Sequence, residues 1–147
     1  MYKHILIPTD GSPTAEKAVV AGIDYAREVG AKVTLFTAVP EYHIPGEAEL
    51  MSHRGLSLAE HESRSRQQAG ETLAAAAARA TSAGVAFDTD YAQSDRPSEA
   101  IIDAARRHGC DAIFMSTHGR QGLAKLWHGS ETIAVLTHTD IPTLVYR

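Results

Sequence analysis

Two short segments of the sequence carry side chains and glycines that could bind an anionic or polar ligand. The first, Pro8–Ser12, reads PTDGS and places a carboxylate in a turn just before an expected helix. The second, Ser116–Gly122, reads STHGRQG and is followed by Gly129 and Ser130. Glycine lacks a Cβ, so its backbone amide can approach an anion closely, and the start of a helix adds a positive dipole. The second segment is open to two interpretations, a phosphate cradle or plain tight turns.

The sequence gives little support for a catalytic site. Asp10 is a weak candidate for a general base, because no sequence motif places a histidine or a second carboxylate beside it. Ser12 and Ser130 lie in no G-x-S-x-G elbow, and helix capping explains both residues more simply. The lone Cys110 precedes an apolar run, which indicates a buried thiol rather than a nucleophile. We therefore predict no catalytic residues.

The eight histidines raise the question of a metal site, above all His108, His118, His128 and His138, which recur every ten residues. That period matches neither a helix nor a strand, and closed zinc sites usually gather ligands about two to five residues apart. We expect no zinc site. His118, inside the second segment, is the histidine best placed to touch a ligand.

The elements that must position the two segments alternate between strands and helices. Apolar runs predict strands at His4–Pro8, Val33–Val39 and Ala112–Met115, with weaker candidates at Val85–Ala92 and Thr143–Tyr146. Helical spacing predicts helices at Pro13–Val29, Leu56–Ala83, Pro97 to Gly109, and Ser130–His138. Apolar strands separated by helices are typical of a parallel sheet with right-handed crossovers. The sequence predicts an α/β fold, an open doubly wound sheet of five strands with four helices.

Local signals mark several boundaries of these elements. Ser12 can cap the first helix, and Gly30 and Gly84 are suited to end helices. The segment Pro40–Gly55 is the one long irregular stretch. Its composition is compatible with either a functional lid or a disordered loop.

Composition limits the classes of protein to which the chain can belong. Its 147 residues, 44% of them hydrophobic, suit a single domain over residues 1–147. The formal net charge of −4 disfavours binding to nucleic acid. No apolar run approaches the roughly 20 residues of a membrane span, so we expect no membrane partner. The first residues lack a secretory pattern, and a cytoplasmic location is expected.

The whole chain resembles the universal stress protein family. The segment His4–Ser12 is similar to the family's first strand and turn, and Met115–Ser130 resembles its ATP-binding signature, G-x-x-G-x9-G-[ST]. Gly119 stands at the second glycine of that signature, nine residues follow, and Gly129 and Ser130 form the closing pair. The resemblance implies the strand order 3-2-1-4-5. Both segments would then meet where the strand order reverses, between the first and fourth strands.

The resemblance also implies a ligand, ATP with Mg²⁺, and the residues that bind it. The adenine would lie near Pro8, Asp10 and Ala38, and the ribose near Asp10 and Ser116. The remaining site residues, most of them facing the phosphates, are His118, Gly119, Arg120, Gly129, Ser130, Glu131 and Thr132.

Two residues depart from the family's pattern. Ser116 stands where the first glycine would be, although serine is small and its hydroxyl could bond the ribose. Glu131 places a carboxylate in the first turn of the phosphate-facing helix, where it would compete with the anion for the same amides. It could instead point away from the site or help hold Mg²⁺.

Two functions from different classes are compatible with these observations. The first is a cytoplasmic stress-response protein that binds ATP and uses occupancy as a signal, with hydrolysis slow at most because phosphoryl-transfer residues are incomplete. The second is an interaction module of the same fold with a degenerate crevice. A third, an adenylating ligase, lacks the expected Ser-Gly-Gly-x-Asp-Ser loop after the first strand.

A homodimer is expected with either function. Thr143–Tyr146 is apolar and falls at an expected sheet edge, where an unpaired strand invites pairing with a second copy. The resemblance implies antiparallel pairing of this strand.

Overall fold

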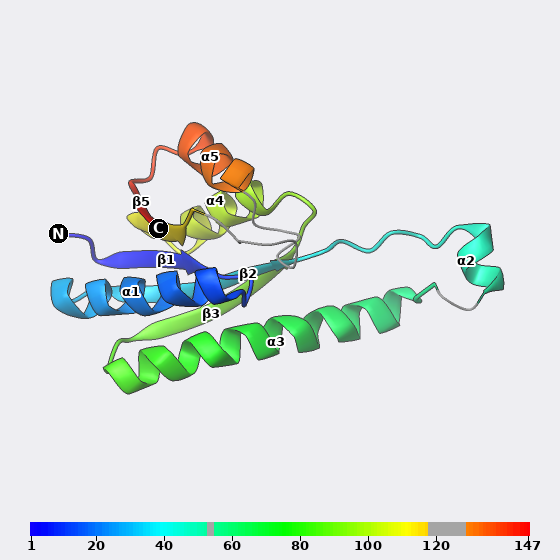
Figure 1. Cartoon of the computed structure of the whole chain (residues 1–147), viewed down its shortest axis with the longest axis horizontal. Helices are drawn as coiled ribbons and strands as arrows, with labels where there is room; N and C mark the ends of the chain where they lie inside the picture. Colours follow the sequence, from blue (N-terminus) through cyan, green and yellow to red (C-terminus); the bar gives the residue numbers. More distant parts are fainter. Residues whose placement is uncertain (53–54, 118–128) are drawn as a thin grey trace.

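The computed structural model describes residues 1–52, 55–117 and 129–147, and Figure 1 shows the arrangement of their elements. In chain order the elements are β1 (His4–Pro8), α1 (Pro13–Val29), β2 (Lys32–Val39), α2 (Glu47–Met51), α3 (Leu58–Ala83), β3 (Phe87–Gln93), α4 (Pro97–Arg107), β4 (Ala112–Ser116), α5 (Gly129–His138) and β5 (Thr143–Tyr146). Every predicted strand and helix is present. The described part of the chain holds five helices rather than the four predicted, because α2 forms within the segment expected to be irregular.

The strands form one parallel sheet in the order β3-β2-β1-β4-β5. The predicted order and the open, doubly wound topology are therefore confirmed. The order reverses between β1 and β4, which lie side by side at the centre of the sheet. Because the two strands are parallel, the ends of β1 and β4 lie at the same edge of the sheet, its carboxyl edge.

Two helical layers cover the sheet, α1 and α3 on one face and α4 and α5 on the other (Figure 1). The core against α1 and α3 includes Ile5, Ile7 and Leu35, while Leu6 and Ile113 belong to the core against α4 and α5. Consecutive residues of β1 point to opposite faces and are both fully buried, which explains why this strand is apolar throughout.

The helix boundaries follow the predicted local signals. Ser12 accepts a hydrogen bond from the Ala15 amide at 3.2 Å and caps α1. Gly30 and Gly84 end α1 and α3 with φ angles of 71° and 70°, in the left-handed region that glycine adopts without a Cβ penalty. The helices of the described ranges are all too short or too polar to cross a bilayer.

The segment between β2 and α3 leaves the body of the molecule as an arm with α2 at its tip (Figure 1). Asp95 holds its base: one carboxylate oxygen accepts from the Glu41 amide at 3.1 Å, and the other lies 2.7 Å from His43 Nε2. Ile44 and Met51 are 86% and 78% exposed. The arm therefore presents apolar side chains to solvent.

Candidate functional site

Asp10 lies in the turn that joins the carboxyl end of β1 to α1. Its Oδ1 accepts a hydrogen bond from the Ser12 amide at 2.9 Å, while the Thr9 hydroxyl accepts from the Gly11 amide at 3.1 Å. Gly11 has a φ of 78°, which lets the chain turn sharply toward α1. The sequence Thr-Asp-Gly-Ser thus folds locally into a turn that fixes the orientation of the carboxylate.

The second oxygen of this carboxylate is the unusual feature of the turn. Asp10 Oδ2 is inaccessible to solvent and has no hydrogen-bond partner within the described ranges. Buried polar atoms are almost always hydrogen-bonded, because an unpaired one loses its hydration without replacement. A carboxylate oxygen can only accept hydrogen bonds. Asp10 Oδ2 can therefore accept a hydrogen bond from an N–H or O–H group that lies outside the described part of the chain.

Two apolar residues of the predicted site flank this turn on the sheet. Pro8 is the last residue of β1 and is in register with Phe36 of β2. Ala38 lies two residues further along β2, in register with Ala92 of β3, and is buried in the core beneath α4. Both residues are buried, so the structure places them in the core next to the carboxyl edge.

Ser116 and Thr132 connect the end of β4 to the start of α5. Ser116 is the last residue of β4 and is half-buried. The buried Thr132 hydroxyl donates to the Ser116 carbonyl at 3.0 Å. The first turn of α5 is thereby held at the carboxyl end of β4, next to β1. Since the Thr132 hydroxyl proton is used inside the protein, this side chain has only acceptor capacity left for a ligand.

Glu131 does not direct its hydrogen bond toward the start of its own helix. Its Oε2 accepts from the Ser98 amide of α4 at 2.9 Å. The sequence left open whether this carboxylate competes for the amides, points away from the site or helps hold Mg²⁺, and the structure shows its Oε2 bonded to a neighbouring helix. Sequence reasoning missed Ser98 as a partner. An indirect signal was present: α4 begins Arg96-Pro97 without a capping side chain, which indicates an amide in need of an acceptor but not which residue supplies it.

The other predicted site residues are divided between two parts of the chain. Gly129 and Ser130 form the start of α5, and Ser130 is exposed. His118, Gly119 and Arg120 lie outside the described residues. The structure thus brings Ser116, Glu131 and Thr132 together at the start of α5, and places Asp10 just after the end of the adjacent strand β1.

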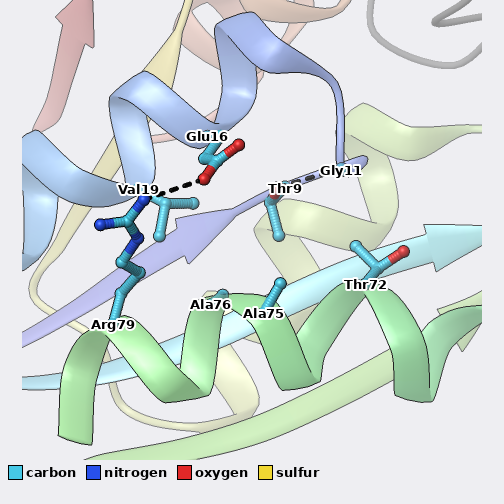
Figure 2. A pocket seen from close by; sticks show the side chains of 8 residues that line it. All are labelled: Thr9, Gly11, Glu16, Val19, Thr72, Ala75, Ala76 and Arg79. Atoms are coloured by element: carbon cyan, nitrogen blue, oxygen red, sulfur yellow. Dashed lines mark hydrogen bonds and ion pairs between the residues drawn. The ribbon is translucent and has the colours of Figure 1, made fainter. Parts of the chain in front are cut away.

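A small cavity lies between the β1–α1 turn, α1 and α3 (Figure 2). Thr9 and Gly11 line its upper side and Thr72 faces them from α3, while an ion pair between Arg79 and Glu16 at 3.2 Å lies at its rim. Its volume is about 50 Å³, enough for a few water molecules but not for a nucleotide. Sequence reasoning did not predict this cavity.

Cysteine and histidine side chains have structural roles where they are described. Cys110 is buried, as predicted, and burial raises the pKa of its thiol to about 11, which disfavours the nucleophilic thiolate. His108 Nε2 lies 2.8 Å from Asp90 Oδ2, and His138 Nδ1 donates to the Ala134 carbonyl at 2.8 Å. Within residues 1–52, 55–117 and 129–147, no three metal-ligating side chains gather into a potential metal site.

The fold is an open, doubly wound α/β domain whose strand order reverses between β1 and β4, the position at which sheets of this kind bind ligands. The model of the universal stress protein family matches residues 1–147, and the chain belongs to this family.

Relatives and solved structures agree with this assignment. Universal stress protein MJ0531 of Methanocaldococcus jannaschii is 29% identical, with 100% of this chain and 83% of the relative aligned. The solved structure of MJ0577, from the same organism, is 25% identical and superimposes with a TM-score of 0.75 over 99% of this chain and 95% of that one. The universal stress protein from Archaeoglobus fulgidus in complex with dAMP is 19% identical, with a TM-score of 0.66 over 99% and 98% of the two chains.

Proposed function

We propose that this protein binds ATP together with Mg²⁺ in the crevice between β1 and β4, and that nucleotide occupancy acts as a signal in the cytoplasm. The observation that carries the proposal is the buried Oδ2 atom of Asp10, which has no partner within the described ranges. An accepting atom fixed at the carboxyl edge of a doubly wound sheet requires a donor. The adenine amino group and the ribose hydroxyls are such donors.

The start of α5 supplies the second half of the proposed site. In this proposal the backbone amides of Gly129 and Ser130 bind phosphate oxygens, aided by the positive end of the helix dipole. Glu131 follows them, and its Oε2 accepts a hydrogen bond from the Ser98 amide of α4. This oxygen therefore does not compete with phosphate for the amides of Gly129 and Ser130. His118, Gly119 and Arg120 would complete the phosphate side, as the signature implies.

Mg²⁺ would enter this site with the nucleotide. The described residues contain no cluster that could hold a metal ion by itself. Phosphate oxygens are ligands that Mg²⁺ prefers, and the ion usually keeps several waters.

A signalling role fits the chemistry of Asp10 better than catalysis does. The carboxylate is fixed by a backbone amide, and within the described ranges no histidine or second acidic side chain forms a hydrogen bond or ion pair with it. We therefore propose binding with hydrolysis that is slow at most. The dAMP complex of the Archaeoglobus fulgidus protein supports an adenine nucleotide as the ligand class, since it is a nucleotide complex on the same fold.

Titration calorimetry with MgATP tests the proposal on the wild type and on Asp10→Asn. The asparagine oxygen can still accept from the Ser12 amide, but its NH₂ group replaces the accepting Oδ2 with a donor. We expect ATP affinity to fall at least about tenfold, because a donor would face the ligand's donors.

Asp24→Asn is the matched control, because Asp24 is 53% exposed and, among the described residues, pairs with Arg27 at the surface. This variant should bind ATP as the wild type does. Absence of both heat and thermal stabilisation for the wild type at millimolar MgATP would contradict the proposed function.

The exposed edge of the sheet favours a second candidate function, a homodimeric interaction module. Val145 and Tyr146 of the edge strand β5 are each 37% exposed, and α5 presents Ile133 and Leu136 at 64% and 49%. An unpaired strand beside apolar side chains is suited to antiparallel pairing with a second copy. We propose this dimer for the nucleotide-binding protein as well.

Sedimentation velocity at micromolar concentration tests the dimer. The wild type should sediment as a dimer, and Val145→Lys should shift it to monomer because an edge lysine opposes strand pairing. Ile44→Lys, on the exposed arm, should leave the dimer intact. A monomeric wild type would exclude this interface, and ATP binding without dimerisation would leave only the nucleotide function.

A further inference from the structure

The first turn of α4 has no cap from its own sequence. Its N-cap residue, Arg96, makes no side-chain cap hydrogen bond, and Pro97 at the first helical position has no N–H to donate. The Ser98 amide is therefore the first of the helix that requires an acceptor. Glu131 supplies it from a different helix, 33 residues away in the chain.

The first turn of α5 is consequently held from two directions. The Thr132 hydroxyl bonds the carbonyl of Ser116 at the end of β4, and the Glu131 carboxylate bonds the Ser98 amide at the start of α4. Two adjacent side chains thus attach one helical turn to a strand and to a second helix. Attachments in two directions restrict the rotation of α5 about its axis as well as its displacement from the sheet.

The charge of Glu131 is also accommodated by this arrangement. A carboxylate at the N-terminus of a helix lies at the positive end of that helix's dipole. The Glu131 carboxylate occupies this position on α4 although the residue belongs to α5. Its negative charge is therefore stabilised by α4.

We propose that Glu131 is a positioning residue of the nucleotide site, which caps α4 from outside and thereby fixes the first turn of α5 where it meets the phosphates. This inference rests on the proposed nucleotide function. It reverses the expectation that the carboxylate hinders phosphate binding.

Calorimetry with MgATP and with adenosine distinguishes positioning from repulsion in Glu131→Ala and Glu131→Gln. The alanine variant should bind ATP about tenfold more weakly, because the α5 turn loses one attachment. The glutamine variant keeps an accepting oxygen and should restore affinity to within about threefold of the wild type. Adenosine affinity should stay unchanged in both variants, since adenosine has no phosphates. Wild-type or tighter ATP binding by the alanine variant would overturn the inference.

Hydrogen exchange of the Ser98 amide tests the same contact without any ligand. We expect exchange at Ser98 to become about tenfold faster in Glu131→Ala and to stay near the wild-type rate in Glu131→Gln. Glu99→Ala is the control, because Glu99 lies in the same turn of α4 but pairs with Arg96 at the surface. Unchanged exchange in Glu131→Ala would show that Glu131 does not cap α4.

The two measurements separate failure of the inference from failure of the proposed function. A wild type that binds no ATP contradicts the nucleotide function and the positioning role, while the exchange result still decides whether the cap exists. A wild type that binds ATP, with an alanine variant of equal affinity, contradicts the positioning role alone.

Discussion

The carboxylates at the two edges of the sheet differ in how completely they are paired with hydrogen-bond donors and cations. Asp88, Asp90 and Asp111 have partners that lie at the amino edge: Asp88 pairs with Lys32 at the start of β2, Asp90 with His108 and Arg107 at the end of α4, and both oxygens of Asp111 accept from backbone amides at the start of β1. At the carboxyl edge Asp10 uses one oxygen in its own turn and buries the other without a described partner. Both edges carry acidic residues, but the buried side-chain oxygen that lacks a partner within the described ranges lies at the carboxyl edge.

This contrast separates structural carboxylates from a ligand-binding one. Although desolvation alone would raise the pKa of Asp90, the hydrogen bond from His108 and the charge of Arg107 lower it. The pKa of Asp111 is lowered in the same way, because hydrogen bonds from the His4 and Lys3 amides outweigh desolvation. A lowered pKa means that the folded protein favours the charged carboxylate, which is the sign of a stabilising role. Removing carboxylates at the two edges should therefore change stability in opposite directions.

The largest effect is expected for Asp90→Ala. The variant leaves the half-buried His108 ring and the Arg107 guanidinium without their shared acceptor, and we expect a loss of about 2 kcal/mol in the free energy of unfolding. Urea denaturation measures this loss. Asp24→Ala removes an exposed ion pair and should change stability by less than about 0.5 kcal/mol. A loss as small as that of the control would show that the amino-edge cluster has no structural role.

The opposite sign is expected for Asp10→Asn in the absence of nucleotide. The substitution removes a buried, incompletely paired charge but keeps the oxygen that accepts from the Ser12 amide. We expect the free energy of unfolding to rise by about 0.5 kcal/mol, as is common when a binding residue is replaced by a neutral one. The same urea titration measures the change. A clear loss of stability would place Asp10 among the structural carboxylates.

Local sequence signals were sufficient to predict most of the fold. Ser12 and Gly30 mark the ends of α1 through interactions within a few residues, and the apolar runs indicate buried parallel strands. The start of β3 was placed two residues early, at Val85. In the structure the Val85 amide bonds the Ala80 carbonyl and completes the end of α3. The five-residue α2 was missed because it carries no buried face that apolar spacing could reveal.

The candidate site was less predictable because its decisive features depend on contacts between distant residues. The signature and the first turn indicated where a ligand could bind. The partner of Glu131 lies in another helix, and no local pattern could choose among the three orientations considered for this carboxylate. The unpaired Asp10 Oδ2 likewise depends on how neighbouring elements bury the turn. Burial and hydrogen-bond pairing are properties of the folded chain.

The smallest effect concerns His4, which belongs to the amino edge. Burial, followed by the charges of Lys32 and His108, lowers the pKa of this ring, whose Nε2 lies 2.7 Å from Thr34 Oγ1. The unfolded chain therefore takes up a proton near pH 6.5, before the folded protein does, and stability should decline as the pH falls below that value.

Urea midpoints at pH 7.5 and pH 5.5 measure this decline in the wild type and in His4→Gln. The glutamine can still bond Thr34 but does not titrate, so the variant should lose less stability over this interval. The difference should be less than about 0.5 kcal/mol, because the partly exposed ring is screened by solvent. Carboxylates with lowered pKa values, such as Asp90, contribute their stability above about pH 4 and lose it only at lower pH, which keeps them out of this interval. Equal losses in both proteins would show that the neutral ring of His4 is not favoured by folding, and that the amino edge is held by its carboxylates alone.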